Sequence, residues 1–257
     1  MKKFSQDEIK QILENKLGVK KGATVFIHSS MNQIQLDFPL HKIISILKEV
    51  IGDEGTLLFP CWQDINNLEE YIKGEKCFDV KRTISNLGIL PELVRRDKQA
   101  QRSWSPTNSV VALGKLSKEL TFEHHLDIYP CGEKSPFYKL VKNDAIIIGI
   151  GVSTRYLSFS HCIEDVKKDK FPFITRTSEI FTFNVKTSDG EIIKVQTKMA
   201  HPDIKNRDVP KYIKTHVPKD IALDMKIHNT SFFYAKAKDL FETMEKLTEQ
   251  GITIYNY

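Results

Sequence analysis

Long apolar stretches are missing from this 257-residue chain. No segment is apolar over the roughly 20 residues that a transmembrane helix needs. The first residues, MKKFSQDEIKQ, have lysines at positions 2 and 3 but no apolar core behind them, so no signal peptide is predicted. Together these absences predict a cytoplasmic protein without a membrane partner.

Cysteine is scarce, and its spacing excludes two kinds of site. Cys61, Cys77, Cys131 and Cys162 lie far apart, with no CxxC pair. We therefore expect free thiols, no disulfide framework and no metal site. Cys162 follows His161 directly, but neighbours on a helix point about 100° apart. Acyl transfer through a Cys162 nucleophile is thus an alternative that the spacing does not favour.

Dense blocks of positive charge are also absent. Lys and Arg number 38 against 33 Asp and Glu, which gives a mild net charge of +5 spread along the chain. This distribution predicts no nucleic-acid partner, but it favours small anionic ligands such as nucleotide phosphates. GxGxxG, GxxxxGK[ST], HExxH and GxSxG motifs do not occur. The chemistry must therefore be sought in less specific patterns.

One stretch combines a buried strand with two residues suited to acid–base chemistry. Residues 145–150 are apolar and mostly branched, which predicts a strand buried on both faces. Ser153 or Thr154 is predicted to cap a helix that holds His161 and Glu164 three residues apart near one face. A carboxylate beside an imidazole fixes its tautomer and raises its basicity, as a general base requires. A surface pair, or a core histidine bonded to backbone, is the alternative.

The remaining periodicity predicts an α/β fold. Buried strands are expected at 24–27, 56–59, 109–113 and 145–150, alternating runs at 180–185 and 191–197 joined by a turn at 187–190, and a strand pair near 221–227. Helices are expected at 5–17, 40–51, 86–96 (capped by Ser85), 116–124, 137–141, 210–216 and 235–250, and loops at 61–81 and 101–106. This order predicts a three-layer α/β/α arrangement around a mixed central sheet, with an antiparallel hairpin in the second half. The whole chain, 1–257, is predicted to be one domain.

Six short motifs then occur in a fixed order. They are HSS after the first strand; GTLLFP; the spaced set Phe78, Thr83, Ser85, Gly88, Leu90, Glu92 and Arg95; the set Arg102, Ser103, Pro106, Ser109, Val110, Ala112, Leu113 and Gly114; the set Gly132, Ser135, Pro136, Lys139 and Leu140; and an apolar strand followed by HxxE. In this order they resemble the aminoglycoside 3-N-acetyltransferase family. The resemblance is strong over residues 20–170 and continues weakly to the C-terminus.

The resemblance implies acetyl-coenzyme A as the donor and a primary amine on a sugar as the acceptor. It also implies direct transfer without a covalent enzyme intermediate, with His161 as general base and Glu164 as its partner. Residues expected to bind coenzyme A or to surround the developing oxyanion are Ser29, Ser30, Arg102, Ser103, Ser109 and Val110. Residues expected near the acceptor are His28, Trp62, Thr83, Trp104 and His125. For Arg102 a surface salt bridge, and for each tryptophan core packing, is the alternative.

One departure from the family bears on the acceptor. Drug-modifying members usually read RSxHPxxS, whereas this chain has Ser105 before Pro106. Because aminoglycosides are polycations and this chain is basic, we expect a nucleotide-linked (dTDP-type) amino sugar for surface glycan synthesis as the acceptor. An aminoglycoside is the alternative acceptor, and a non-catalytic coenzyme A or nucleotide binder is the alternative function. The sequence leaves the oligomeric state open.

Overall fold

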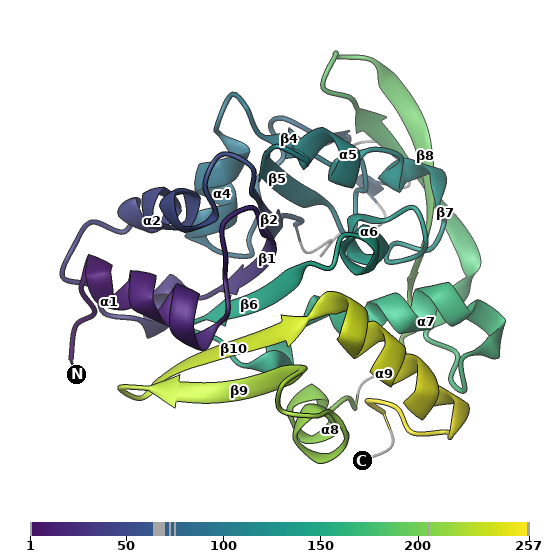
Figure 1. Cartoon of the computed structure of the whole chain (residues 1–257). Helices are drawn as coiled ribbons and strands as arrows, with labels where there is room; N and C mark the ends of the chain where they lie inside the picture. Colours follow the sequence, from purple (N-terminus) through teal and green to yellow (C-terminus); the bar gives the residue numbers. More distant parts are fainter. Residues whose placement is uncertain (1, 64–69, 72, 75, 205, 256–257) are drawn as a thin grey trace.

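Three parallel strands form the middle of the main sheet (Figure 1). The computed structural model describes residues 2–63, 70–71, 73–74, 76–204 and 206–255. Within it, β1 (Thr24–Ser29) lies between β2 (Thr56–Pro60) and β6 (Ile146–Ile150) and is parallel to both. All three are nearly continuous runs of buried residues, as parallel strands covered on both faces must be.

Antiparallel strands extend the sheet on both sides, in the order β4-β5-β2-β1-β6-β10-β9. On one side lie β5 (Val110–Gly114) and β4 (Gln101–Arg102); on the other lie β10 (Thr230–Lys236) and β9 (Ala222–Ile227). β9 and β10 form the strand pair expected near 221–227. Their turn holds His228 and Asn229 at φ values of 49° and 68°, which suits the twist of a tight hairpin.

Helices cover both faces of this sheet, which confirms the predicted three layers (Figure 1). Val25 and Ile27 pack in one core with α1 (Gln6–Gln11), α2 (Lys42–Ile51) and α4 (Ile89–Arg95). Phe26, between them in sequence, belongs to a second core on the opposite face. That core holds α5 (Ser117–Thr121), α6 (Pro136–Lys142), α7 (His161–Lys167), α8 (Val209–His216) and α9 (Ala237–Glu249). Among the described helices, none has the length and hydropathy needed to cross a bilayer.

The predicted hairpin of the second half belongs to a separate small sheet. β7 (Arg176–Lys186) and β8 (Ile192–Ala200) pair antiparallel, with Phe183 opposite Val195. The two-residue strand β3 (Phe78–Asp79) joins β7 in parallel. The hairpin therefore has its own core of Phe78, Phe183, Val185 and Val195, and it stands beside the main sheet.

Two predicted helix starts are wrong. Ser85 accepts from the Leu87 amide and donates to the Trp62 carbonyl, so it stabilises the loop, and α4 begins only after Gly88, at Ile89. Neither Ser153 nor Thr154 caps α7, because the Thr154 amide and hydroxyl both bond to Asp224 on β9. Two 3₁₀ turns, Thr154–Tyr156 and Ser158–Ser160, separate this point from α7. The predicted loop 61–81 includes residues 64–69, 72 and 75, which lie outside the described residues.

Two buried histidines make stability depend on pH. Burial lowers the pKa of His28 to about 3 and that of His124 to about 4, against an ordinary value of 6.5. Below pH 6.5 the unfolded chain therefore binds protons that the folded chain does not, so stability is complete above pH 6.5 and falls as the pH falls.

We expect the free energy of unfolding, measured with urea, to fall by about 2 kcal/mol per buried histidine between pH 7 and pH 5. His124→Gln should make this slope shallower by one histidine's share. An unchanged slope in that variant would contradict the assignment.

Candidate active site

The carboxyl ends of β1, β2 and β6 meet at one edge of the main sheet. β1 has β2 on one side and β6 on the other, so this edge is the switch point at which open α/β sheets place their ligands. The chain ends are closely packed there: a Cβ on Gly151 would lie 2.4 Å from the Ser30 carbonyl oxygen. After β6, the two 3₁₀ turns lead to α7, whose first residue is His161.

His161 and Glu164 contact each other within the first turn of α7. His161 Nδ1 lies 3.0 Å from Glu164 Oε1, and the Tyr255 hydroxyl donates to the same oxygen at 2.8 Å. The Glu164 side chain is 2% exposed and that of His161 is 20% exposed. Burial alone would raise the pKa of Glu164, but His161, Arg176 and Tyr255 outweigh it and hold that pKa below its usual value. Glu164 is therefore ionised at neutral pH and accepts both hydrogen bonds.

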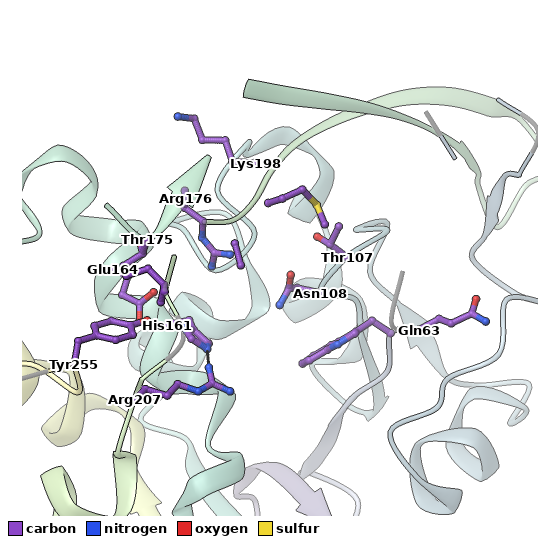
Figure 2. Close-up of a pocket in the computed structure, with 14 residues that line it drawn as sticks. Gln63, Thr107, Asn108, His161, Glu164, Thr175, Arg176, Lys198, Arg207 and Tyr255 are labelled. Carbon is purple, nitrogen blue, oxygen red and sulfur yellow. Dashed lines mark hydrogen bonds and ion pairs between the residues drawn. The ribbon is translucent and has the colours of Figure 1, made fainter. Parts of the chain in front are cut away.

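The other ring nitrogen of His161 faces a guanidinium. Arg207, which comes just before α8, contacts His161 Nε2 through Nη1 (Figure 2). Arginine can only donate, so Nε2 must be the accepting nitrogen. Nδ1 then carries the hydrogen and donates it to Glu164. This tautomer places the basic lone pair on Nε2, opposite the carboxylate.

A pocket of about 460 Å³ opens beside this histidine. Figure 2 shows His161, Glu164 and Tyr255 on one side, with Thr107 and Asn108 across from them. The lining comes from the loops after β2 and before β5, α7, the β7–β8 hairpin with the residue before it, the segment before α8 and the C-terminal segment. Its residues are Trp62, Gln63, Thr107, Asn108, His161, Glu164, Thr175, Arg176, Lys198, Met199, Ala200, Ile204, Arg207 and Tyr255. An acid–base pair thus lies in a cavity large enough for part of a small-molecule ligand.

A buried ion pair fixes the helix that carries this pair. Arg176 Nε and Nη2 donate to the two Asp165 oxygens at 2.6 and 2.8 Å, and the Cys131 amide donates to Asp165 Oδ2 at 2.7 Å. The Asp165 side chain is fully buried. Burial alone would lower the pKa of Arg176, but Asp165 outweighs it and raises that pKa. The pair ties α7 to the start of β7 and to the loop before α6.

Comparison with known proteins agrees with this architecture. The family model described as "Aminoglycoside 3-N-acetyltransferase" matches residues 26–249. The chain belongs to this family. The aminoglycoside N(3)-acetyltransferase IX of Micromonospora chalcea is 30% identical over 175 residues, which cover 60% of this chain and 61% of that protein. The match thus spans less than two thirds of that relative's length.

Solved structures of aminoglycoside acetyltransferases share the fold. The crystal structure of AAC(3)-Xa superposes with a TM-score of 0.82 at 21% identity, covering 97% of this chain and 94% of that one. The AAC-IIIb binary complex with CoASH superposes with a TM-score of 0.80 at 19% identity, covering 98% of both chains. At these identities the likeness establishes the fold alone.

The structure places Arg102 inside this family fold. Its guanidinium donates to the backbone carbonyls of Thr83 (2.6 Å), Val80 and Cys61 and to Ser109 Oγ, and it stacks on the Phe78 ring. Arg102 is therefore not exposed to bind a phosphate of coenzyme A, and it does not form the surface salt bridge that was the alternative. Arg102 joins the end of β2 to the loop before α4, which does not fit the expected role as a coenzyme A ligand.

The Ser103, Ser109 and Val110 groups are also used internally. Ser103 Oγ accepts from the Val110 amide at 2.9 Å and bonds to His124 Nδ1 at 2.8 Å. The Val110 carbonyl accepts from the Ser103 amide, and Ser109 Oγ donates to the Cys61 carbonyl. The Val110 amide and carbonyl therefore already have partners, which does not fit the expected binding of coenzyme A by this backbone.

Of the residues predicted near the acceptor, Trp62 lines the pocket. His28 is buried against Phe26 and Phe233, Thr83 Oγ1 accepts from the Asp79 amide, and Trp104 stacks on His125. None of these four lines that pocket.

The Ser30 amide donates to the Ile150 carbonyl, whereas Ser29 Oγ is buried without a partner in the described part of the chain. Ser105 accepts from the Asn108 amide, so the residue replacing the family's histidine shapes the turn that presents Asn108.

Cys162 points into the core. It is fully buried, and burial raises the pKa of its thiol well above the ordinary value. A buried, protonated thiol is a poor nucleophile, so this placement disfavours acyl transfer through Cys162.

Several pocket residues are missing from the sequence-based candidates. Thr107 and Asn108 lie inside the RSxxPxxS motif, which could have suggested them. Arg176, Arg207 and Tyr255 had no comparable signal, because the tertiary fold alone brings them to α7.

The Tyr255 hydroxyl is expected to stabilise the protein measurably through Glu164. Because Glu164 is buried and ionised, Tyr255→Phe should lower the free energy of unfolding by about 1.5–3 kcal/mol in a urea titration. Tyr156→Phe, which removes the same hydroxyl from a side chain that is 61% exposed, serves as the matched control. Equal effects of the two substitutions would show that the contact with Glu164 contributes nothing.

Proposed function

We propose that this protein transfers an acetyl group from acetyl-coenzyme A directly to the amino group of an amino sugar. The observation that carries the proposal is the 3.0 Å contact between His161 Nδ1 and Glu164, which leaves the Nε2 lone pair toward the pocket. Membership of the acetyltransferase family and the CoASH complex of a structural neighbour support the donor.

His161 acts on the proton of the acceptor. An ammonium group has no lone pair with which to attack a carbonyl, so a base must first remove a proton. Nε2 accepts that proton while Nδ1–H donates to Glu164, which stabilises the imidazolium that forms. The same nitrogen can then return this proton to the departing sulfur, while the second proton that the amine loses in becoming an amide passes to solvent. Tyr255 positions Glu164 through the same oxygen that His161 contacts.

The pocket contains hydrogen-bond donors that fit the oxygen of a thioester. Acetyl-coenzyme A supplies the activated acetyl group, and the oxygen of that group needs hydrogen-bond donors as charge develops on it. Thr107 Oγ1 is buried without a partner in the described part of the chain and lines the pocket across from His161. Thr107 and the neighbouring Asn108 are therefore our candidates for these donors.

Two acceptors are supported by different observations. The names of the relatives indicate an aminoglycoside. The charges in the pocket support the nucleotide-linked amino sugar instead, since Arg207 and Lys198 line it and its one lining carboxylate among the described residues, Glu164, is bonded to His161 and Tyr255. Polycations bind where carboxylates gather, and the described lining offers them none that is unpaired.

The test of the proposed function is release of free thiol from acetyl-coenzyme A. We expect acceptor-dependent release with at least one of a dTDP-linked amino sugar, glucosamine, kanamycin and sisomicin, and a product heavier by one acetyl group. If no amine accelerates thiol release, a non-catalytic binder is the better account.

A further inference from the structure

Arg207 blocks the ring nitrogen of His161 that the reaction needs. Its Nη1 donates into the Nε2 lone pair of His161, which is the one free acceptor of the neutral ring. A nitrogen that already accepts this hydrogen bond cannot take a proton from an incoming amine. Catalysis by His161 therefore requires Arg207 to turn away first.

The part of the chain that the structure describes offers Arg207 no competing partner. Within the described residues it forms no ion pair, and the lining carboxylate, Glu164, points to Nδ1 and Tyr255 on the other side of the ring. Arg176 lines the same pocket but is held by both oxygens of Asp165. The charge that moves Arg207 must therefore come from what binds in the pocket.

The side chain can move while its backbone stays. The next residue, Asp208, donates its amide to the Ile254 carbonyl at 3.0 Å, and its side chain caps α8 by accepting from the Lys211 amide at 3.0 Å. Arg207 thus starts from an anchored point, and its flexible stem allows the guanidinium to rotate away from Nε2. Lys198, which extends over the Tyr129 ring, adds a second positive charge to the lining.

We propose that Arg207 is an acceptor-sensing residue, which leaves His161 Nε2 when it binds an anionic group of the acceptor. This inference rests on the proposed function and names its substrate class: an amino compound with a phosphate or carboxylate within reach of the amine. A guanidinium binds such oxygens by paired, charge-assisted hydrogen bonds, which compensate for the lost contact with the imidazole. A polycation supplies no such partner, and Arg207 and Lys198 repel it.

The kinetic test uses acceptors that differ in the anion. Glucosamine 6-phosphate and muramic acid add a phosphate and a carboxylate, respectively, to the parent glucosamine, which carries no anionic group. A dTDP-linked amino sugar and kanamycin represent the two candidate acceptor classes. We expect the wild-type kcat/KM to be highest for one of the anionic acceptors. Comparing the acceptors that carry a phosphate, a carboxylate and a diphosphate then identifies the anion that Arg207 binds. Arg207→Gln should lower that value about 10- to 100-fold and should raise the value for glucosamine and kanamycin, because Nε2 is then uncovered and one repelling charge is gone.

Arg96→Gln, which removes a charge of the same kind from a side chain that is 71% exposed at the C-cap of α4, should change neither value. Preference of the wild type for kanamycin, or an equal loss for every acceptor in Arg207→Gln, would overturn the inference while leaving acetyl transfer intact. Absence of turnover with every amine would instead count against the proposed function.

Two readouts do not need turnover. Diethyl pyrocarbonate acylates unprotonated imidazole nitrogen, so modification of His161, followed by peptide mass spectrometry, should be several-fold faster in Arg207→Gln than in wild type or Arg96→Gln. Binding of inorganic pyrophosphate, measured by calorimetry, should weaken by the same 10- to 100-fold in Arg207→Gln only. Unchanged acylation would show that Arg207 does not cover Nε2, and unchanged binding that it holds no anion.

Discussion

Replacing His161 by alanine is expected to lower kcat by about 10²- to 10⁴-fold, the range over which a positioned general base contributes. His161 is the titratable pocket residue whose lone pair is directed by a carboxylate partner, at 3.0 Å. Without it the amine must lose its proton to water, and Tyr255 and Glu164 cannot replace it because they are bonded to each other. The measurement is the rate of thiol release from acetyl-coenzyme A at saturating acceptor.

His228→Gln is the matched control, since His228 lies in the β9–β10 turn and contacts Glu8, outside the pocket. Cys162→Ala distinguishes acyl transfer through Cys162 from general-base catalysis by His161. Acyl transfer through Cys162 requires that this variant abolish turnover while His161→Ala merely slows it. Our mechanism requires the opposite order of effects, so measuring both variants decides between the two mechanisms.

The central fold followed from the sequence because its signals are local. The runs at 24–27, 56–59 and 145–150 are buried on both faces in the structure, and the turn at 187–190 joins β7 to β8 as expected. The start of α7 could not be predicted in this way. Thr154 has the local chemistry of a helix cap, but Asp224, 70 residues away in sequence, takes both of its donors.

The same difference between local and long-range contacts decides which site residues the sequence predicts. His161 and Glu164 can be predicted from the sequence, because a spacing of three residues on one helix brings two side chains together wherever that helix packs. The motif predicts a ligand-binding role for Arg102 and Ser103, although a motif records which residues occur together but not which way they face. In the structure they face inward and hold β2, β4 and β5 together. Arg207 and Tyr255 reach His161 and Glu164 from 46 and 91 residues away, respectively, a distance at which sequence spacing carries no information.

Arg176→Met is expected to lower the free energy of unfolding by about 3–5 kcal/mol. Removing one partner of a buried ion pair leaves the other charge without compensation, and here Asp165 has no solvent exposure at all. The remaining Cys131 amide provides one hydrogen bond at 2.7 Å but no charge. Asp165 lies next to Glu164 on α7, so the loss should also loosen the helix turn that aims His161. Urea titration at pH 7 measures the loss.

The double variant Asp165→Asn/Arg176→Met identifies the cause of that loss. It removes both charges but keeps an amide oxygen that can accept from Cys131, so it should recover a large part of the stability lost in Arg176→Met. A double variant that is no more stable than the single one would mean that Arg176 acts through packing, and a loss below about 1 kcal/mol in Arg176→Met would mean that the pair does not fix α7. The recovery also predicts a separation between folding and catalysis. The double variant should fold stably yet transfer acetyl groups more slowly than wild type, because α7 would then have lost its ionic tie to β7 while His161 and Glu164 themselves remain in place.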